Sequence, residues 1–254
     1  MKDQHPLQDV YDYASFLPKE YREELEKYYS ESEGSNVWKL QSFTKYVPRQ
    51  SITRFLVRYE IFKKILPMQG SIVEIGVLDG ASLMAWAQFS AIFEHLNHQR
   101  KIIGFDMFGD KPQIGPEDHT GINVKMYEEG KMSLNSFDDI KESIRIFDKN
   151  RFLGSQEKVI LVKGNVKDTA PEYLKSNPET IVSLLYLDVN LYEPTKAALD
   201  TFLPRMPKGS VIVFDELNDR GLPGETLAVI DSIDLKTIQI ERFSFDTKIS
   251  YAVL

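Results

Sequence analysis

The sequence predicts an α/β fold in which a mostly parallel, seven-stranded sheet is covered by helices on both faces. From Ser71 onward, short runs rich in Val and Ile alternate with stretches whose apolar residues recur at helical spacing. The runs are almost continuously apolar, which is typical of parallel strands buried on both faces. The last stretch, residues 236–254, breaks the alternation and predicts an antiparallel hairpin with a turn near Asp246.

Residues 1–50 differ in composition from the rest, being rich in Tyr, Glu and Lys and poor in Val and Ile. A helix is expected to begin at Pro18 and to end before Gly34. A second helix is expected from Ser51, which would be its N-cap. We therefore expect 1–50 to form an N-terminal helical arm, either a lid or a structural extension, and 51–254 to form the main domain.

The main domain is expected to alternate five strands with four helices before the hairpin. The expected strands are 71–77, 101–107, 158–164, 181–189 and 209–217. The expected helices are 82–98, 136–150, 168–176 and 193–206. The polar, turn-rich stretch 108–136 is too long for an ordinary connection and is typical of a functional loop.

Composition and charge exclude several classes of function. The 254 residues are sufficient for one large core, and the net charge of −7 argues against a nucleic-acid partner, which requires clustered Lys and Arg. The absence of Cys excludes disulfides and thiolate chemistry. We see neither the apolar segment of a signal peptide nor a run of about 20 apolar residues that could cross a bilayer. We expect a cytoplasmic protein that does not bind membranes, whereas homo-oligomerisation stays open.

Carboxylates end four of the five expected strands. Ligands of such sheets bind outside the carboxyl ends of the strands, so these residues are candidates for the site. In chain order the strand ends carry Glu74, Asp106, Asn165, Asp188 and the pair Asp215-Glu216.

The turn after the first strand, VEIGVLDGAS at 73–82, predicts the cofactor. It lacks the Gly-Lys-Ser/Thr of a P-loop and the second glycine of a dinucleotide fingerprint, and Glu74 would repel a pyrophosphate. S-adenosylmethionine fits, because it carries positive charge and a ribose but no phosphate. We expect Glu74, Gly76, Gly80 and Ser82 to bind it and Asp106 to bond the ribose hydroxyls.

The acidic residues after the fourth and fifth strands predict a metal site. Asp188, Asp215 and Glu216 should converge at the mouth of the sheet, and with no basic residue nearby they would repel one another. A hard divalent cation, Mg²⁺ above all, would relieve that repulsion. The alternative is that each carboxylate caps the helix or turn that follows it.

Four segments at these strand ends resemble the macrocin-type O-methyltransferases, metal-dependent enzymes that use S-adenosylmethionine to methylate sugar hydroxyls in antibiotic biosynthesis. The segments are EIGVLDGAS, IIGFDMFGD, LLYLDVNLYEPTKAAL and GSVIVFDELN. The resemblance covers residues 45–254 and rests mainly on the order of the segments. It implies a Rossmann-like class I methyltransferase domain with an N-terminal lid, acting on a sugar-containing small molecule.

The resemblance also implies particular ligands. In this family an Asp after the fourth strand and an acidic pair after the fifth hold Mg²⁺, which gives Asp188, Asp215 and Glu216 here. Asn165 and Val166 are the implied adenine contacts. The sequence departs from the family at two of these positions, because Glu216 stands where Asp is usual and Asn165 where Asp is frequent.

Methyl transfer from a sulfonium requires a positioned hydroxyl that loses its proton. Mg²⁺ would lower the pKa of that hydroxyl. Asp188 is the expected base as well as a ligand, and His119, in the long loop, is the second candidate base. A catechol or another vicinal diol as acceptor, and a catalytically silent protein that binds S-adenosylmethionine, stay open as alternatives. A nicotinamide oxidoreductase is disfavoured by the missing glycine.

Overall fold

The computed structural model describes residues 17–129 and 132–254. The chain is divided into two compact units, Met1–Leu56 and Val57–Leu254. Residues 1–16 of the expected N-terminal arm lie outside the described residues.

The first unit consists of short helices held together by aromatic contacts. It contains α2 (Lys19–Glu31), α3 (Asn36–Gln41), the 3₁₀ helix η1 (Phe43–Lys45) and the beginning of α4 (Arg49–Ile65). The ring of Tyr46 stacks on Tyr28 and meets Tyr29 edge-on, with ring centroids 5.6 and 5.3 Å apart. None of the residues of α2 is buried, so the contacts of Tyr46 are the main packing in the described part of this unit.

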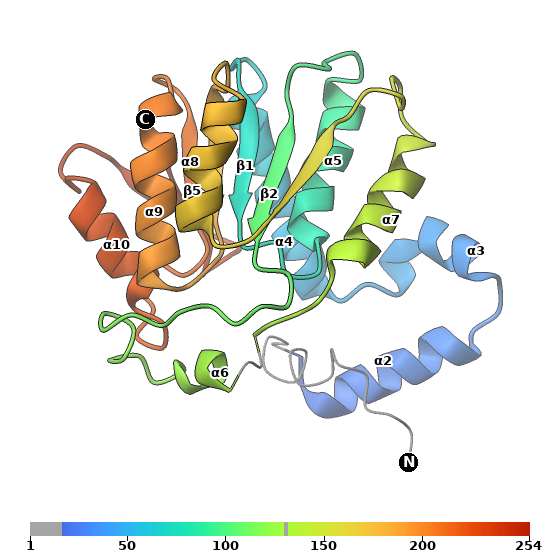
Figure 1. The fold of residues 1–254 in the computed structure, drawn as a ribbon. Coiled ribbons are helices and arrows are strands. Elements are labelled where there is room, and N and C mark those ends of the chain that lie inside the picture. The colour runs from blue at the N-terminus through green and yellow to red at the C-terminus, as the bar shows by residue number, and fades with distance from the viewer. Residues whose placement is uncertain (1–16, 130–131) are drawn as a thin grey trace. The chain divides into compact units, whose positions relative to one another are not determined.

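A seven-stranded sheet forms the centre of the second unit, as predicted (Figure 1). Its strands are β1 (Ser71–Ile75), β2 (Ile102–Asp106), β3 (Val159–Lys163), β4 (Val182–Leu187), β5 (Val211–Phe214), β6 (Ile240–Arg242) and β7 (Ser250–Val253). Their order is β3-β2-β1-β4-β5-β7-β6. The first five strands are parallel, and β7 pairs antiparallel with β5 and with β6. The expected C-terminal hairpin is therefore confirmed.

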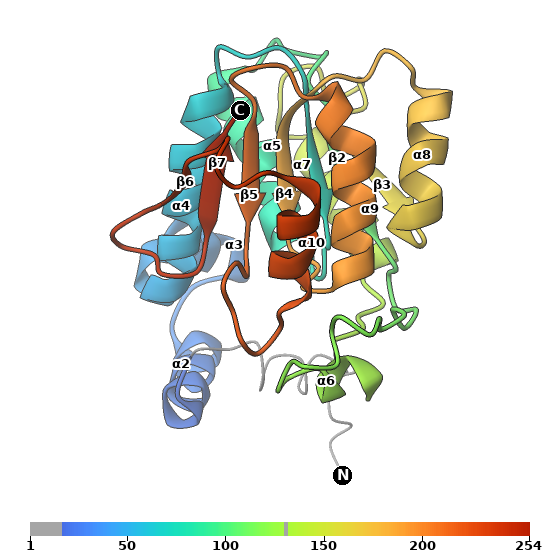
Figure 2. The same ribbon diagram turned by 90° about the vertical axis from the view of Figure 1, so that its left-hand side faces the viewer.

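Helices cover both faces of this sheet, which Figures 1 and 2 show from two sides. One face packs against α4, α5 (Ala81–Phe93) and α7 (Phe137–Asp148). The other packs against α8 (Val166–Ser176), α9 (Tyr192–Phe202) and α10 (Gly224–Ser232). The short elements α6 (Lys125–Glu128) and η2 (Leu203–Arg205) lie in the connections. Strands β1, β2, β4 and β5 are buried almost throughout, which explains their continuously apolar sequences.

Two helix predictions need correction. Helix α4 begins at Arg49, and the backbone N–H of Ser51 already bonds the carbonyl of Pro48, so Ser51 lies inside the helix and is not its N-cap. Pro48 starts this helix because it needs no partner for a backbone N–H. Helix α10 was not predicted; no side chain caps its N-terminus, so the sequence lacks the usual start signal.

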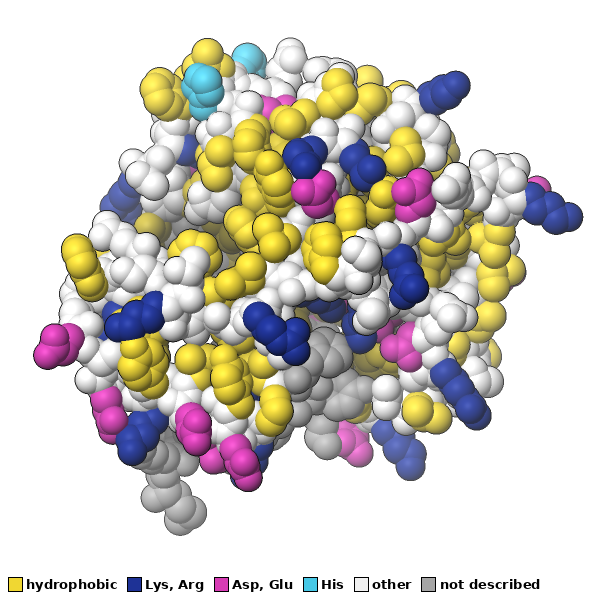
Figure 3. Space-filling view, turned by 180° about the vertical axis from the view of Figure 1, so that it is seen from behind, with side chains coloured by type: hydrophobic (Ala, Val, Ile, Leu, Met, Phe, Trp, Pro, Cys, Tyr) yellow, Lys and Arg dark blue, Asp and Glu magenta, His cyan; other side chains and the backbone are white. Residues whose placement is uncertain are grey.

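Within residues 17–129 and 132–254, none of the helices has both the length and the apolar character needed to span a membrane. Figure 3 shows the molecule from the side opposite to Figure 1. On this face the Lys and Arg side chains are spread among acidic and apolar ones, and the described residues form no continuous basic surface there.

Candidate active site

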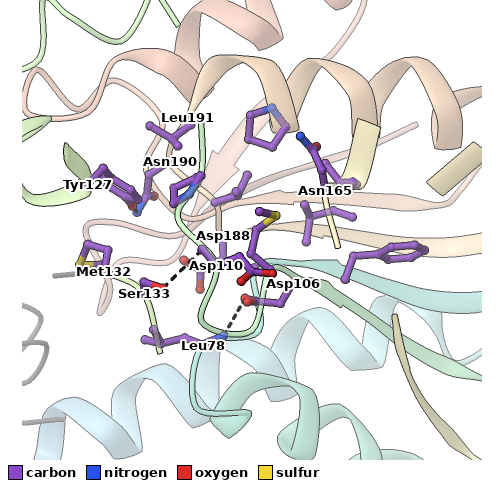
Figure 4. A pocket seen from close by; sticks show the side chains of 18 of the residues that line it. Leu78, Asp106, Asp110, Tyr127, Met132, Ser133, Asn165, Asp188, Asn190 and Leu191 are labelled. Carbon is purple, nitrogen blue, oxygen red and sulfur yellow. Dashed lines mark hydrogen bonds between the residues drawn. The ribbon is translucent and has the colours of Figure 1, made fainter. Parts of the chain in front are cut away.

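A cavity of about 980 Å³, counting the space open to solvent, lies at the carboxyl ends of the parallel strands. The chain runs outward from β1 to β3 and then crosses back to β4, so β1 and β4 form the point where the strand order reverses. Ligands of such sheets bind at this reversal. The cavity is lined by the ends of β1 to β4, the first turn of α9 and part of the long loop 108–136 (Figure 4).

Five of the expected site residues line the cavity: Gly76, Asp106, Asn165, Val166 and Asp188. Asp106 and Asp188 are labelled in Figure 4 together with Asp110, and all three line the same cavity. Six other expected residues are not part of the cavity wall: Glu74, Gly80, Ser82, His119, Asp215 and Glu216.

Gly76 brings the ends of β1 and β4 together. Its φ of 88° lies in the left-handed region, and a Cβ there would collide with the carbonyl oxygen of Asp188. The glycine thus permits a close approach, as expected, but to the protein's own backbone. This contact fixes where Asp188 stands relative to the turn after β1.

Asp106 holds the loops around it. One of its carboxylate oxygens accepts from the backbone N–H groups of Val77 and Leu78, at 2.7 and 3.1 Å. The other accepts from the N–H of Phe108 at 2.6 Å. Leu78 and Phe108 both have positive φ, of 52° and 48°, so the carboxylate supports two turns in an unfavourable conformation. Three of its about four acceptor positions are therefore occupied by the protein.

Glu74 and Ser82 belong to the core, so the expectation that they bind the cofactor needs correction. Glu74 is fully buried and accepts from the Ser82 hydroxyl at 2.5 Å and from the Trp86 indole at 2.9 Å. Burial raises the pKa of Glu74 to about 7. Strand side chains alternate between faces, and position 74 points toward α5. The spacing of Ser82 and Trp86, one turn apart on that helix, is the signal that could have revealed this.

Gly80 is likewise outside the cavity wall. It has a φ of 85° at the start of α5, and a Cβ there would lie 2.9 Å from the side chain of Ile140. Packing against α7 therefore accounts for this glycine.

The far side of the cavity carries the expected adenine residues. Asn165 is the N-cap of α8, and its side chain accepts from the N–H of Lys167 at 3.0 Å. Val166 follows it on the wall. The sequence reasoning did not single out Asp110, an exposed residue of the long loop that also lines the cavity.

The long loop is attached to the β4–α9 turn by Asp118. This carboxylate is 2% exposed and accepts from the N–H groups of Tyr192 and Gly115, at 2.9 and 3.0 Å. Burial raises its pKa. Its neighbour His119 is instead largely exposed, with Glu128 as a distant partner at 3.9 Å. His119 therefore lies outside the cavity, which does not support its expected role as a base.

Tyr127 and Asn190 make a second link between the loop and the β4–α9 turn. The Asn190 amide donates to the Tyr127 hydroxyl at 2.7 Å, and both residues line the cavity. Asn190 has a φ of 62°, which Asn tolerates better than most residues do. The loop is thus part of the cavity wall rather than a simple connection.

Asp215, which follows β5, is oriented by a hydrogen-bonded chain of two side chains, Tyr186 and Arg58. It is 3% exposed and accepts from the Tyr186 hydroxyl at 2.8 Å. Arg58 of α4 in turn donates to the Tyr186 oxygen at 3.4 Å. The tyrosine orients the carboxylate, so Asp215 is fixed by residues of β4 and α4.

Glu216 has a cationic partner, which corrects the expectation that no basic residue lies nearby. Lys248, in the loop between β6 and β7, contacts its two oxygens at 2.8 and 3.1 Å. Burial still raises the pKa of Glu216 to about 7, since Asp215 adds to the rise and Lys248 only partly opposes it. Lys248 is distant in sequence, so spacing alone could not reveal it.

A fourth carboxyl group, Glu225, was missed by the sequence reasoning. It lies on α10, is fully buried, and accepts from the backbone N–H of Glu216 at 3.0 Å. Burial raises its pKa well above the usual range, and the charges of Asp215, Asp188 and Glu216 act in the same direction. The described part of the chain offers no hydrogen-bond partner to its other oxygen, Oε2.

The donor chemistry of this acidic edge suits Mg²⁺, although the side chains are not assembled as a finished metal centre. Among the described residues, no three His, Asp or Glu side chains form a group ready to hold a metal ion. Carboxylate oxygens are nevertheless the ligands that Mg²⁺ prefers. Within the described part of the chain, the buried Oε2 of Glu225 has no hydrogen-bond partner and leaves one carboxylate oxygen of this edge unsatisfied.

Comparisons with known proteins agree with this geometry. The sequence profile of the methyltransferase domain family matches residues 73–217, from β1 to just beyond β5. A curated relative from Streptomyces olivaceus, 8-demethyl-8-(2,3-dimethoxy-alpha-L-rhamnosyl)-tetracenomycin-C 4'-O-methyltransferase, is 25% identical over 148 residues. That match covers 58% of this chain and spans about half, 52%, of the relative.

Solved structures extend the likeness to nearly the whole chain. A crystal structure of the calicheamicin methyltransferase CalS11 has a TM-score of 0.88 and 28% identity, covering 99% of this chain and 98% of that one. Its apo structure, described as a TDP-rhamnose 3'-O-methyltransferase, has a TM-score of 0.79 at the same 28% identity, covering 97% and 99%. The O-methyltransferase NovP, at 20% identity and a TM-score of 0.62 over 80% of this chain and 79% of its own, shares the fold.

Proposed function

Because this chain belongs to the methyltransferase domain family, we propose that it transfers the methyl group of S-adenosylmethionine to a hydroxyl of a sugar carried on a nucleotide or another small molecule. The main support for this proposal is the similarity to CalS11 over almost the full length of both chains. The tetracenomycin 4'-O-methyltransferase, which matches part of this chain, is also named for a rhamnosyl substrate, methylated at the 4' position. A 6-deoxysugar is therefore the acceptor that we would test first.

The cavity supports S-adenosylmethionine as the methyl donor. It lies at the β1–β4 reversal, where a nucleoside ligand is expected, and the ends of four parallel strands line it. In our proposal Asn165 and Val166 contact the adenine. The ribose hydroxyls bond Asp110 or the remaining acceptor position of Asp106. Carboxylates on the wall favour the positive charge of the sulfonium and ammonium groups.

The transfer itself is an in-line displacement. The acceptor oxygen attacks the methyl carbon, a C–O bond forms, and the C–S bond breaks with its electron pair left on S-adenosylhomocysteine. Asp188, on the cavity wall, takes the proton that the hydroxyl loses. The long loop, held by Asp118 and by the Tyr127–Asn190 pair, forms the wall that orients the sugar and limits access of water.

We further propose that the reaction depends on Mg²⁺ held by Asp188, Asp215 and Glu216. The support is the carboxylate donor set and the buried Glu225 oxygen that has no hydrogen-bond partner among the described residues. When bound, Mg²⁺ would lower the pKa of the acceptor hydroxyl. The buried Tyr186–Asp215 bond keeps one of these ligands oriented, whereas Lys248 contacts both oxygens of Glu216 and would compete with a metal for them.

The N-terminal arm is proposed to act as a lid. Hydrogen exchange over residues 17–50 should then slow when S-adenosylmethionine is added. Identical exchange with and without the cofactor would favour the structural extension instead.

The function is tested by measuring S-adenosylhomocysteine formation with three acceptors: a TDP-6-deoxysugar, a rhamnosyl glycoside and a catechol. Each is assayed with Mg²⁺ and with excess chelator. Turnover of a sugar acceptor that stops in chelator is the expected result. Preference for the catechol would reject the sugar assignment, and full sugar turnover in chelator would reject the metal. Binding of S-adenosylmethionine with no turnover of any acceptor would favour a silent binding protein.

A further inference from the structure

Glu225 is the buried carboxyl group that the proposed mechanism leaves unused. It occupies the first turn of α10, directly after Gly224. A Cβ at Gly224 would collide with the Asp118 carboxylate and would lie 2.5 Å from the backbone nitrogen of Tyr192. The start of α10 is therefore pressed against the turn that follows Asp188, while the Glu225 side chain reaches the end of β5.

The two oxygens of this carboxyl group have different surroundings. Oε1 accepts from the backbone N–H of Glu216 at 3.0 Å, which places the whole group beside that residue. Oε2 is buried and has no hydrogen-bond partner in residues 17–129 and 132–254. A buried polar atom without a partner is costly and calls for an explanation, such as a bound ion.

Four ionisable side chains at this edge are Asp188, Asp215, Glu216 and Lys248. Asp188, Asp215 and Glu216 are carboxylates, which only accept hydrogen bonds when ionised. Lys248 is directed to the two oxygens of Glu216. A hard divalent cation prefers oxygen ligands, so it suits a carboxylate-rich edge with one buried acceptor that has no hydrogen-bond partner among the described residues.

We propose that Glu225 is a fourth carboxylate of the metal site, with Oε1 fixing the backbone of Glu216 and Oε2 offered to the ion. This inference rests on the proposed Mg²⁺ dependence. It differs from the sequence-based ligand set in one useful respect: residues 17–129 and 132–254 place no ion-pair partner on Glu225, whereas Lys248 contacts both oxygens of Glu216. The competing view is that Glu225 is a purely structural acid that anchors the backbone after β5.

Binding of Mn²⁺, measured by calorimetry in the absence of acceptor, separates the two views. Mn²⁺ takes the same oxygen ligands as Mg²⁺ and serves as the probe. Glu225→Gln keeps an oxygen for the Glu216 N–H but replaces Oε2 by an uncharged amide nitrogen, which cannot bind a metal. Mn²⁺ affinity should fall about 10-fold or more. The matched control is Asp231→Asn, a change on the same helix at a carboxylate that accepts from the exposed Tyr192 hydroxyl at 2.9 Å. This variant should bind Mn²⁺ as the wild type does.

Unchanged Mn²⁺ affinity in a folded Glu225→Gln protein would overturn the inference, while the three-ligand site would stand. If Glu225→Gln does not fold, Glu225→Asp is used instead, because its side chain is shorter by one methylene group. Its Mn²⁺ affinity is compared with that of the wild type in the same way. A wild type that methylates sugars in chelator and binds no Mn²⁺ would remove both the metal proposal and this inference. Weaker Mn²⁺ binding in Glu225→Gln, with no sugar turnover by any protein, would support the inference and reject the function.

Discussion

The carboxylates at the two ends of the candidate site are held in opposite ways. Asp106, at the end of β2, receives three backbone N–H groups and is fully integrated into the turns around it. At the end of β5, Glu216 relies on a lysine from a distant loop, and Glu225 has an oxygen with no partner in the described part of the chain. A carboxylate that accepts hydrogen bonds from backbone N–H groups helps to hold the fold. A carboxylate that pairs with a side chain, or that has an oxygen without a partner, is available to an added cation.

The largest effect should come from Asp188, which lies between these two regions. Asp188→Asn keeps the size of the side chain but removes the charge, so proton acceptance and metal binding are lost together. We expect turnover at saturating Mg²⁺ to fall on the order of 10²–10⁴-fold. Initial rates over a Mg²⁺ titration measure this, and binding of S-adenosylmethionine should persist.

Glu216→Gln is the matched variant for that experiment. It removes one ligand, and the amide has no ionic bond to Lys248, so the protein should need more Mg²⁺ but keep part of its saturated rate. An Asp188→Asn enzyme as fast as the wild type at saturating metal would contradict the assignment of Asp188 as the base.

The second test concerns the backbone-held end of the site. Asp106→Ala leaves three N–H groups without their acceptor, and we expect the free energy of unfolding to fall by about 1.5–3 kcal/mol. Binding of S-adenosylmethionine should weaken as well, because the turn after β1 loses its support. Denaturant unfolding and calorimetry provide the two measurements.

Asp110→Ala is the control that separates support from contact. Asp110 lines the cavity, and its hydrogen bond with the Ser133 hydroxyl uses its backbone oxygen, which the substitution keeps. If Asp110 bonds the ribose, its loss should weaken cofactor binding and leave the unfolding free energy unchanged. Equal cofactor affinity in Asp110→Ala and the wild type would leave Asp106 as the ribose contact.

The third test uses the buried Glu74, whose pKa is raised from 4.5 to about 7 by burial. The folded state holds this proton more tightly than the unfolded state does. Its contribution to stability is therefore fully present below about pH 4.5 and is lost as the pH rises to about 7. Glu74→Gln should remove this part of the pH dependence. Parallel unfolding curves for wild type and variant across that range would show that Glu74 titrates normally.

The smallest effect is expected for Tyr186→Phe. The ring stays in the core, but Asp215 loses the hydroxyl that orients it at 2.8 Å. The loss of one hydrogen bond of about 1 kcal/mol should raise the Mg²⁺ concentration needed for half-maximal activity several-fold while the saturated rate changes little. A changed saturated rate with an unchanged Mg²⁺ requirement would place Tyr186 in the chemistry instead of behind the ligand.

Much of the fold follows from local pattern, because buried parallel strands must be continuously apolar and their carboxyl ends must meet at one edge. Asp106 and Asp188 were found for that reason, and both line the cavity. Glu74 was misplaced because a residue near a strand end points to one face or the other. Its direction toward Ser82 and Trp86 depends on packing with α5.

The acidic edge was harder to predict because its partners come from distant parts of the chain. Lys248 approaches from the hairpin loop, and Glu225 comes from a helix without a capping signal. His119 was favoured by its chemistry alone, yet the neighbouring Asp118 makes the buried contacts. Residue type suggested a site here, but only the three-dimensional pairing shows which carboxylates are already occupied.

The close contact between Gly76 and the Asp188 carbonyl has a consequence for changing what the protein recognises. Because a Cβ at position 76 would collide with this carbonyl oxygen, a side chain there would force the two central strands apart. In the proposed function the loop 108–136 orients the acceptor, so this loop is the segment in which acceptor preference can change without disturbing the strands. Libraries aimed at new acceptors should diversify that segment, keep Asp118 as its attachment, and leave the turn after β1 untouched.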